Sequence, residues 1–252
     1  MLKNYIPAPF HPYFAESLLS FPIQETKATC FNCNHTFNPS LKCCTYHPFL
    51  PNFLVGVILQ DPSTAPESIK AIESKITNKE YALPLGLIAP TSLQIPFNRR
   101  IPGEFGHRAD WACPFLLADS NQCGIWKNRN SQCTSFYCKS DYGSNGFQFW
   151  DNIKKHMHSV EIEIAKKILK DFNWCESSVE LQKDFLNRRE GSLFETQFNY
   201  LRDVDWNRHW KDTDLSPHDF YLECSRLFLE KSSTWSASYQ ESSAKIPTPK
   251  PV

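Results

Sequence analysis

The sequence predicts a mostly helical α+β fold with irregular, proline-rich segments, in which a metal-stapled, cysteine-rich first part packs on a helical second part. Three observations lead to this expectation. Eight of the ten cysteines lie between residues 30 and 138, proline (18) outnumbers glycine (8), and helical periodicity dominates beyond residue 147. We therefore expect a cysteine-cluster region at 1–147, a helical region at 148–232 and a disordered tail at 233–252.

Local signals place two elements of the first part. Thr64 and Glu67 have capping-box spacing ahead of isoleucines at steps of three and four, which predicts a short amphipathic helix over 65–77. The segment 82–97 is apolar and interrupted by prolines. Because proline removes a backbone donor, we expect short edge strands or extended loops there rather than a helix.

The second part carries stronger helix signals. Apolar residues recur at steps of three and four through 148–171, which predicts a long helix. Ser177 and Ser192 are each followed three residues later by glutamate and should begin two further helices. The Ser-Pro pair at 216–217 has the pattern of an N-cap with a first-turn proline and opens a last helix through about Lys231. The two middle helices should bury Leu181, Phe185, Phe194, Phe198 and Leu201.

Composition bounds the partners and the compartment. Lys plus Arg and Asp plus Glu are both 27, so the net charge is zero and indicates neither a nucleic acid nor an anionic membrane as partner. Residues 1–21 are broken by prolines and lack the apolar stretch of a secretory signal. No later run approaches the roughly 18–20 apolar residues of a membrane span. We expect a cytoplasmic protein with an unidentified substrate or protein partner.

The cysteines are the candidate functional residues, because in a reducing compartment many thiols indicate metal before disulfides. A two-residue gap lets a tight turn aim two thiolates at one ion. Thiolates in this number suit zinc or iron–sulfur clusters and disfavour magnesium or calcium. The alternative is that single members are small buried hydrophobes. The predicted ligands are Cys30, Cys33, Cys43 and Cys44, followed by Cys113, Cys123, Cys133 and Cys138.

Cys43 and Cys44 are adjacent and cannot easily form a disulfide with each other. In extended backbone their side chains would point to opposite faces and could serve two sites. A turn could instead direct both thiols to one polynuclear cluster. We predict that at least one of the two binds metal, and that the pair lies where the first cysteine group meets the second.

The blocks "KCCTYHPFLPNFLVG" (42–56), "CPFL" (113–116), "CGIW" (123–126) and "CTSF" (133–136) resemble the YkgJ family of cysteine-cluster proteins, described as zinc- or iron-chelating. The resemblance covers roughly 28–140. The nine residues between the first two cysteine pairs form a wider gap than in the family, so whether these pairs share a centre stays open. Some proteins resembling this family are flagellin lysine N-methylases that use S-adenosylmethionine. This chain shows no glycine-rich strand–turn–helix for that cofactor, and methylation is not predicted.

Two functions follow from the thiols and the resemblance. The first is a cytoplasmic iron–sulfur protein of the YkgJ type, in which one or two clusters of the 4Fe-4S kind support a redox step or the modification of a protein or small molecule. The alternative is a zinc-stapled structural or binding protein without catalysis. The ferredoxin run of four closely spaced cysteines is missing, so electron carriage by that module is not implied.

Four histidines are further candidate residues. His35 and His47 lie in the first cysteine region and could replace a thiolate as ligands. His156 and His158 lie on different faces of the long helix and are expected to be solvated.

Three arginines and two isolated cysteines complete the candidates. Arg99, Arg100 and Arg108 could bind an anion near Cys113, although a solvated or salt-bridged loop is the favoured interpretation. The isolated Cys175 and Cys224 are expected to be structural.

Overall fold

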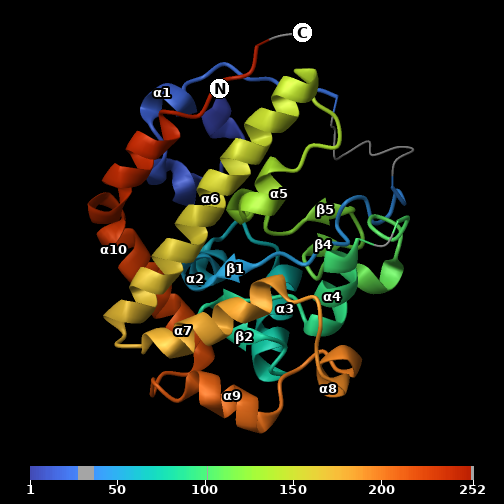
Figure 1. Ribbon diagram of the computed structural model, residues 1–252, viewed down its shortest axis with the longest axis vertical. Coiled ribbons are helices and arrows are strands. Elements are labelled where there is room, and N and C mark those ends of the chain that lie inside the picture. The colour runs from blue at the N-terminus through green and yellow to red at the C-terminus, as the bar shows by residue number, and fades with distance from the viewer. Residues whose placement is uncertain (28–36, 101, 251–252) are drawn as a thin grey trace.

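The computed structural model describes residues 1–27, 37–100 and 102–250. Long helices enclose a few two-residue strands (Figure 1), so the predicted mostly helical α+β fold is confirmed. The α-helices are α1 (Glu16–Leu19), α2 (Asn52–Gln60), α3 (Pro66–Thr77), α4 (Thr91–Arg99), α5 (Ser131–Ser135), α6 (Gly143–Asp171), α7 (Glu176–Lys183), α8 (Leu193–Gln197), α9 (Asp203–Trp210) and α10 (Pro217–Ser243). Short 3-10 helices are η1 (Leu2–Asn4), η2 (Ala8–Tyr13), η4 (Ala109–Trp111), η5 (Trp126–Asn128) and η6 (Asp184–Asn187).

The strands form two small antiparallel sheets. The first has the order β1-β3-β2, built from β1 (Leu50–Pro51), β2 (Ala82–Leu83) and β3 (Gly86–Leu87). The second pairs β4 (Leu116–Leu117) with β5 (Gln122–Cys123). In the second sheet, Leu116 lies opposite Cys123. This pairing brings the backbone of the two later cysteine blocks together.

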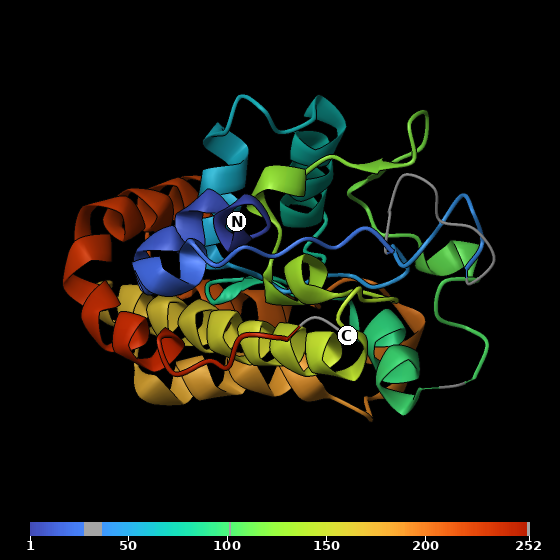
Figure 2. The same ribbon diagram turned by 90° about the horizontal axis from the view of Figure 1, so that it is seen from above.

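The cysteine-rich and helical parts share one hydrophobic core. Phe53 of α2 stacks on Phe228 of α10 with ring centroids 4.3 Å apart, and Tyr13 stacks on the same phenylalanine at 6.0 Å. All three side chains are almost completely buried. Seen from above, α6 and α7 lie on one side of the molecule and α2 and α3 on the other (Figure 2). Neither part therefore buries its apolar surface alone.

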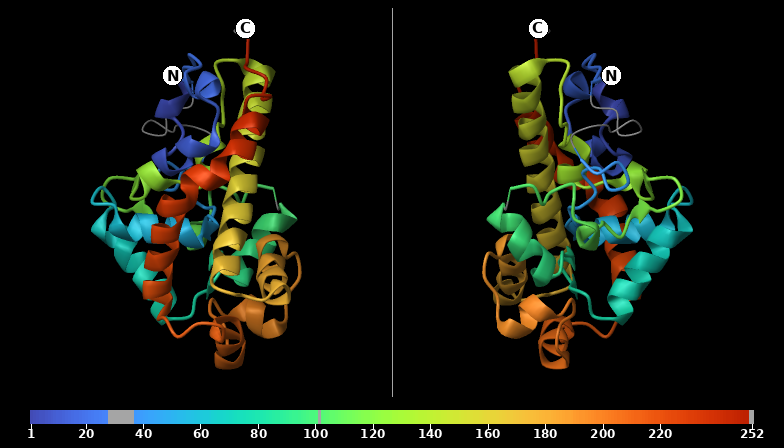
Figure 3. Two further views of the ribbon diagram at one scale, coloured as in Figure 1. Left: turned by 90° about the vertical axis from the view of Figure 1, so that its left-hand side faces the viewer. Right: turned by 90° about the vertical axis from the view of Figure 1, so that its right-hand side faces the viewer.

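Helix α10 lies against both α2 and α6, and Figure 3 shows α6 and α10 side by side. Its approach to α2 depends on Gly56, where a Cβ atom would lie only 2.0 Å from the Tyr221 carbonyl oxygen. Near its end, the Ser243 hydroxyl accepts a 2.7 Å hydrogen bond from the Ala15 amide. The Gln240 amide also donates to the Pro12 carbonyl at 2.8 Å. Helix α10 thus ties the first residues of the fold to the last ones.

The predicted helices at 65–77, 148–171 and 192 onward are confirmed as α3, α6 and α8, although α6 begins earlier, at Gly143. The capping box between Ser192 and Glu195 is present. The predicted stripe is only partly buried, because Phe185 and Leu201 are in the core whereas Phe198 is exposed. Helix α7 is capped at Cys175, two residues before the predicted serine.

Two predictions of secondary structure are wrong. The segment 82–97 contains the expected short strands, but its second half is the helix α4. Pro90 is the N-cap of that helix, and Pro96 removes only one of its few internal hydrogen bonds. The tail predicted at 233–252 is helical through Ser243, because Trp235 and Tyr239 pack against the core and override the low helix propensity of a serine-rich sequence.

Candidate metal centre

Five of the predicted ligands line one cavity of about 960 Å³, which we call the cysteine cavity. They come from three places in the chain: a turn before β1, the β4–β5 region, and α5. Aromatic and basic side chains complete its walls. The five cysteines are Cys43, Cys44, Cys113, Cys123 and Cys133. Segments up to ninety residues apart in the sequence therefore present their thiols to one space.

The adjacent cysteines lie in a turn and not in extended backbone. Lys42 adopts a left-handed conformation (φ 56°), and the Cys44 amide donates a 3.0 Å hydrogen bond to the Leu41 carbonyl. Because of this turn both cysteines of the pair line the same cavity, and the closeness of the Cys44 thiol raises the pKa of Cys43. Of the two geometries that the sequence left open, the structure has the turn.

Backbone contacts fix the other cysteines relative to this turn. The Cys113 amide donates to the Cys44 carbonyl at 2.7 Å, which joins the first cysteine block to the second. Cys123 is held by the β4–β5 pairing. Asn130 caps α5 by accepting a 3.0 Å hydrogen bond from the Cys133 amide. The meeting of the two blocks, predicted from the sequence, is confirmed for these residues.

Burial and mutual repulsion disfavour the thiolate forms in this cavity. Burial raises the pKa of Cys113 to about 12 and raises the pKa of Cys133 well above its ordinary value. The interaction of its thiol with that of Cys44, followed by burial, raises the pKa of Cys43 strongly. Several thiolates can coexist here only if a cation compensates their charge. Sulfur is the donor type that a thiophilic metal prefers, and such a metal would keep these atoms deprotonated.

Arg129 is the basic side chain that acts most directly on these thiols. Its guanidinium carbon lies 3.4 Å from the centroid of the Trp126 ring, and its Nε donates to the Trp126 carbonyl at 3.0 Å. Its positive charge lowers the pKa of Cys43 and Cys133, in opposition to burial. The sequence interpretation singled out other arginines and missed this one, although it lies between two cysteine blocks.

The remaining predicted ligands lie elsewhere. Cys30, Cys33 and the nearby His35 fall outside the described residues. Cys138 is exposed and does not line the cysteine cavity. Within residues 1–27, 37–100 and 102–250, no three His, Cys, Asp or Glu side chains are placed closely enough to hold a single ion. The described thiols thus surround a space without forming a ready-made coordination shell.

The other candidates have varied environments. His47 donates from Nε2 to the Ala112 carbonyl at 3.0 Å, and burial lowers its pKa to about 4. His156 is buried and bonded to the Tyr13 carbonyl at 2.9 Å, so the expectation that it is solvated is wrong. Cys224 is a core residue as predicted, whereas Cys175 is exposed.

The three arginines separate into different settings. Arg108 pairs with Glu104 and Asp110, which confirms the salt-bridged interpretation for that arginine. Arg100 is exposed and lines the cysteine cavity, and Arg99 is exposed.

No family model matches the chain, no curated protein matches it, and no solved structure matches it. Among the described residues, no helix is both long and apolar enough to cross a membrane.

Proposed function

We propose that the protein is a cytoplasmic iron–sulfur protein of the YkgJ type, with its cluster in the cysteine cavity. The observation that carries the proposal is the gathering of Cys43, Cys44, Cys113, Cys123 and Cys133 around one space. A four-iron cluster needs four thiolates, and Cys30 and Cys33, which lie outside the described residues, are further candidates.

The size of the cavity favours a cluster over a lone ion. Thiolate ligands close directly on zinc at about 2.3 Å, so a single ion needs little space between them. The cysteine cavity has about 960 Å³, which accommodates an inorganic core and leaves room for a substrate beside it. Such a cluster would supply one-electron redox chemistry or a Lewis-acidic iron for the modification of a protein or small molecule.

The protein's own residues would tune this centre. Arg129 places a positive charge near Cys43 and Cys133, where it offsets the negative charge of a thiolate-bound cluster and favours its reduced form. The apolar walls near Phe115 and Ile125, both almost completely buried, limit the access of water to the same sulfur atoms. These two effects act on the reduction potential in opposite directions.

A zinc-stapled structural protein without catalysis is the second candidate. It is favoured by the backbone of 102–130, where regular structure is limited to the two-residue strands β4 and β5 and to η4 and η5. A metal would hold these loops in place of regular hydrogen bonding. This alternative assigns the same thiols to a different ion.

Anaerobic purification followed by metal and sulfide analysis separates the two candidates. We expect coloured protein that contains iron and acid-labile sulfide in similar amounts, and a loss of both in Cys133→Ser. The exposed Cys175→Ser is the matched control and should keep them. Colourless protein that holds zinc and no acid-labile sulfide would rule out the iron–sulfur proposal.

A further inference from the structure

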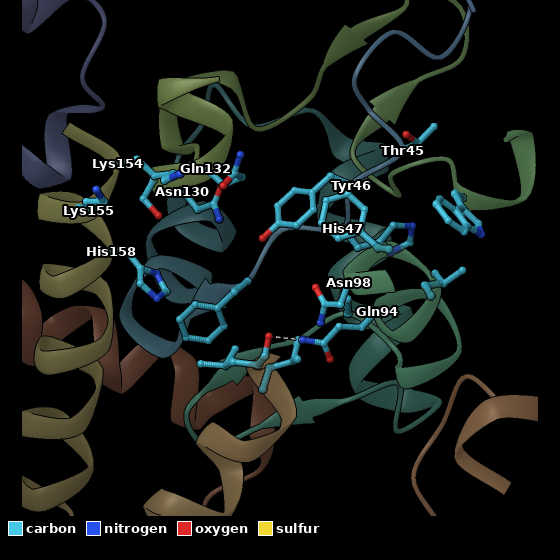
Figure 4. Close-up of a pocket in the computed structure, with 18 residues that line it drawn as sticks. Thr45, Tyr46, His47, Gln94, Asn98, Asn130, Gln132, Lys154, Lys155 and His158 are labelled. Atoms are coloured by element: carbon cyan, nitrogen blue, oxygen red, sulfur yellow. Dashed lines mark hydrogen bonds between the residues drawn. The ribbon is translucent and has the colours of Figure 1, made fainter. Parts of the chain in front are cut away.

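A second, smaller cavity of about 290 Å³ adjoins the cysteine cavity. Tyr46, Asn130 and Lys154 line both spaces, so they stand in the wall between them. Figure 4 shows the Tyr46 side chain reaching into the middle of the smaller cavity. This volume is at the lower end of the range for small-molecule sites, which span about 300–1,000 Å³. We call this space the side pocket.

One side of the side pocket carries basic side chains. Lys154, Lys155 and His158 all come from α6 and stand together on one side in Figure 4. Asp151 accepts from Lys154 at 2.7 Å and from Lys155 at 2.6 Å, so one carboxylate is shared by two lysines. The Nδ1 of His158 lies 3.4 Å from the buried Glu161 carboxylate, so this wall holds two ammonium groups and a histidine beside two carboxylates. The basic side chains are also partly solvated, so an anionic group could reach them from water.

The opposite side presents buried acceptors that lack donors. Gln94 is 8% exposed, and its Nε2 donates to the Leu186 carbonyl while its Oε1 has no hydrogen-bond partner. The Nε2 of His47 donates to the Ala112 carbonyl, which leaves Nδ1 as an acceptor on the neutral ring, also without a partner. A buried acceptor without a donor costs about 1–3 kcal/mol. Two of them at one cavity wall indicate a ligand that brings an O–H or N–H group.

The charge near these acceptors indicates an uncharged donor. Lys75 of α3 acts on His47 electrostatically and helps to keep its ring neutral, although its ammonium is paired with Glu80 at 3.3 Å. A second ammonium brought by a ligand would face this lysine. A hydroxyl group satisfies the same acceptors without that repulsion. Between the two ends, the buried Phe49 and Ile88 offer an apolar surface.

We propose that the side pocket binds a small linear aliphatic hydroxycarboxylic acid. Its carboxylate lies toward Lys154, Lys155 and His158, its methylene chain crosses Phe49 and Ile88, and its far hydroxyl donates to Gln94 or His47. The assignment depends on the contacts of the pocket itself and not on the identity of the metal. It goes beyond the proposed cluster by naming a ligand class for the space beside it.

Calorimetric titration of the purified full-length protein tests the assignment. The probes are 4-hydroxybutanoate, 5-hydroxypentanoate and 6-hydroxyhexanoate, each compared with the alkanoate, the alkanol and the amino acid of matched length. At least one hydroxy acid should bind about tenfold more tightly than each of its three matched analogues, as expected for one satisfied buried acceptor. If no hydroxy acid exceeds its alkanoate, or if the amino analogue binds more tightly, the proposal is wrong.

Variants assign the binding to this pocket. Gln94→Met should abolish the preference for the hydroxyl, and Gln148→Met, an exposed glutamine on α6, should retain it. Lys155 is exposed, so Lys155→Gln should fold normally, but it should weaken the binding of the hydroxy acid and of the alkanoate alike. Lys170→Gln, at another exposed position, should weaken the binding of neither. Unchanged binding in Lys155→Gln would overturn the assignment even if Gln94→Met failed to fold. Metal analysis of the same samples shows separately whether the cluster proposal holds.

Discussion

The amide of Cys113 donates a 2.7 Å hydrogen bond to the carbonyl of Cys44. This contact fastens the loop before β4 to the turn that carries the adjacent cysteines. The two halves of the cysteine cavity are therefore coupled through the backbone as well as through any shared metal. A substitution in one half should therefore also destabilise the other half.

Cys43→Ser and Cys44→Ser should each lower the bound metal and the melting temperature of the protein. Serine keeps the volume but is a poor ligand for a soft metal. Metal analysis and thermal unfolding measure both effects, with the exposed Cys175→Ser as control. If both single variants and the double variant keep full metal content and the wild-type melting temperature, the pair serves only packing.

The thiols of the cysteine cavity should be protected by metal and not by disulfides. In the native protein we expect Cys43, Cys44, Cys113 and Cys133 to resist alkylation, and a chelator alone should make them reactive. Intact-mass measurement before and after chelation counts the modified thiols. Sites that open only after a reductant is added would show that a disulfide blocks them.

His209 should make the protein less stable in mild acid. Burial, assisted by the charge of Arg208, lowers its pKa from 6.5 to about 4 in the folded protein. Between these values the unfolded chain binds a proton that the folded chain excludes, so the free energy of unfolding falls as the pH drops below about 6.5. From pH 7.5 to pH 5 this one group should cost about 2 kcal/mol.

Urea unfolding of His209→Leu at the two pH values measures this contribution. The variant should lose about 2 kcal/mol less than the wild type over that interval. His218→Leu, at a half-exposed position in the first turn of α10, is the control and should follow the wild type. Equal pH dependence in all three proteins would contradict the prediction.

Gly56→Ala should destabilise the protein although alanine is the better helix former. At an exposed helical site the change would stabilise by about 1 kcal/mol. Here the added methyl group meets the Tyr221 carbonyl at 2.0 Å and Ser225 at 2.8 Å, so α2 and α10 must separate. We expect a loss of about 3 kcal/mol in the free energy of unfolding. Ser233→Ala, at an exposed position of α10, should change the free energy of unfolding little. If Gly56→Ala unfolded at the same denaturant midpoint as the wild type, the close packing of α2 and α10 would be refuted.

Local chemistry made some elements predictable. The capping box of Ser192 and Glu195 joins neighbours in the sequence, so α8 could be predicted without knowledge of the fold. The left-handed Lys42 carries no such signal, because only the surrounding structure holds a non-glycine residue there. For that reason the sequence left the direction of the adjacent thiols open.

Packing between distant segments determines the extent of the last helix and the lining of the side pocket, and local sequence does not report it. The last helix reaches Ser243 because its aromatic side chains find partners in the core, which propensity does not report. The cysteines could be recognised from their spacing, since ligand types are fixed by chemistry. Gln94 and His47 could not, because nothing in either local sequence indicates that their unpartnered acceptors line one pocket.

The hydrogen bond between Ala15 and Ser243 spans 228 residues of sequence, and it has a consequence for protein synthesis. While the ribosome is still translating, the ring of Tyr13 lacks its partners Phe228 and Tyr239, because these residues are synthesised much later. The apolar side chains around Tyr13 therefore stay exposed to solvent until the core can form. We expect nascent chains stalled before α10 to be recognised by chaperones and degraded by proteases, and chains that include α10 to become resistant within one folding event.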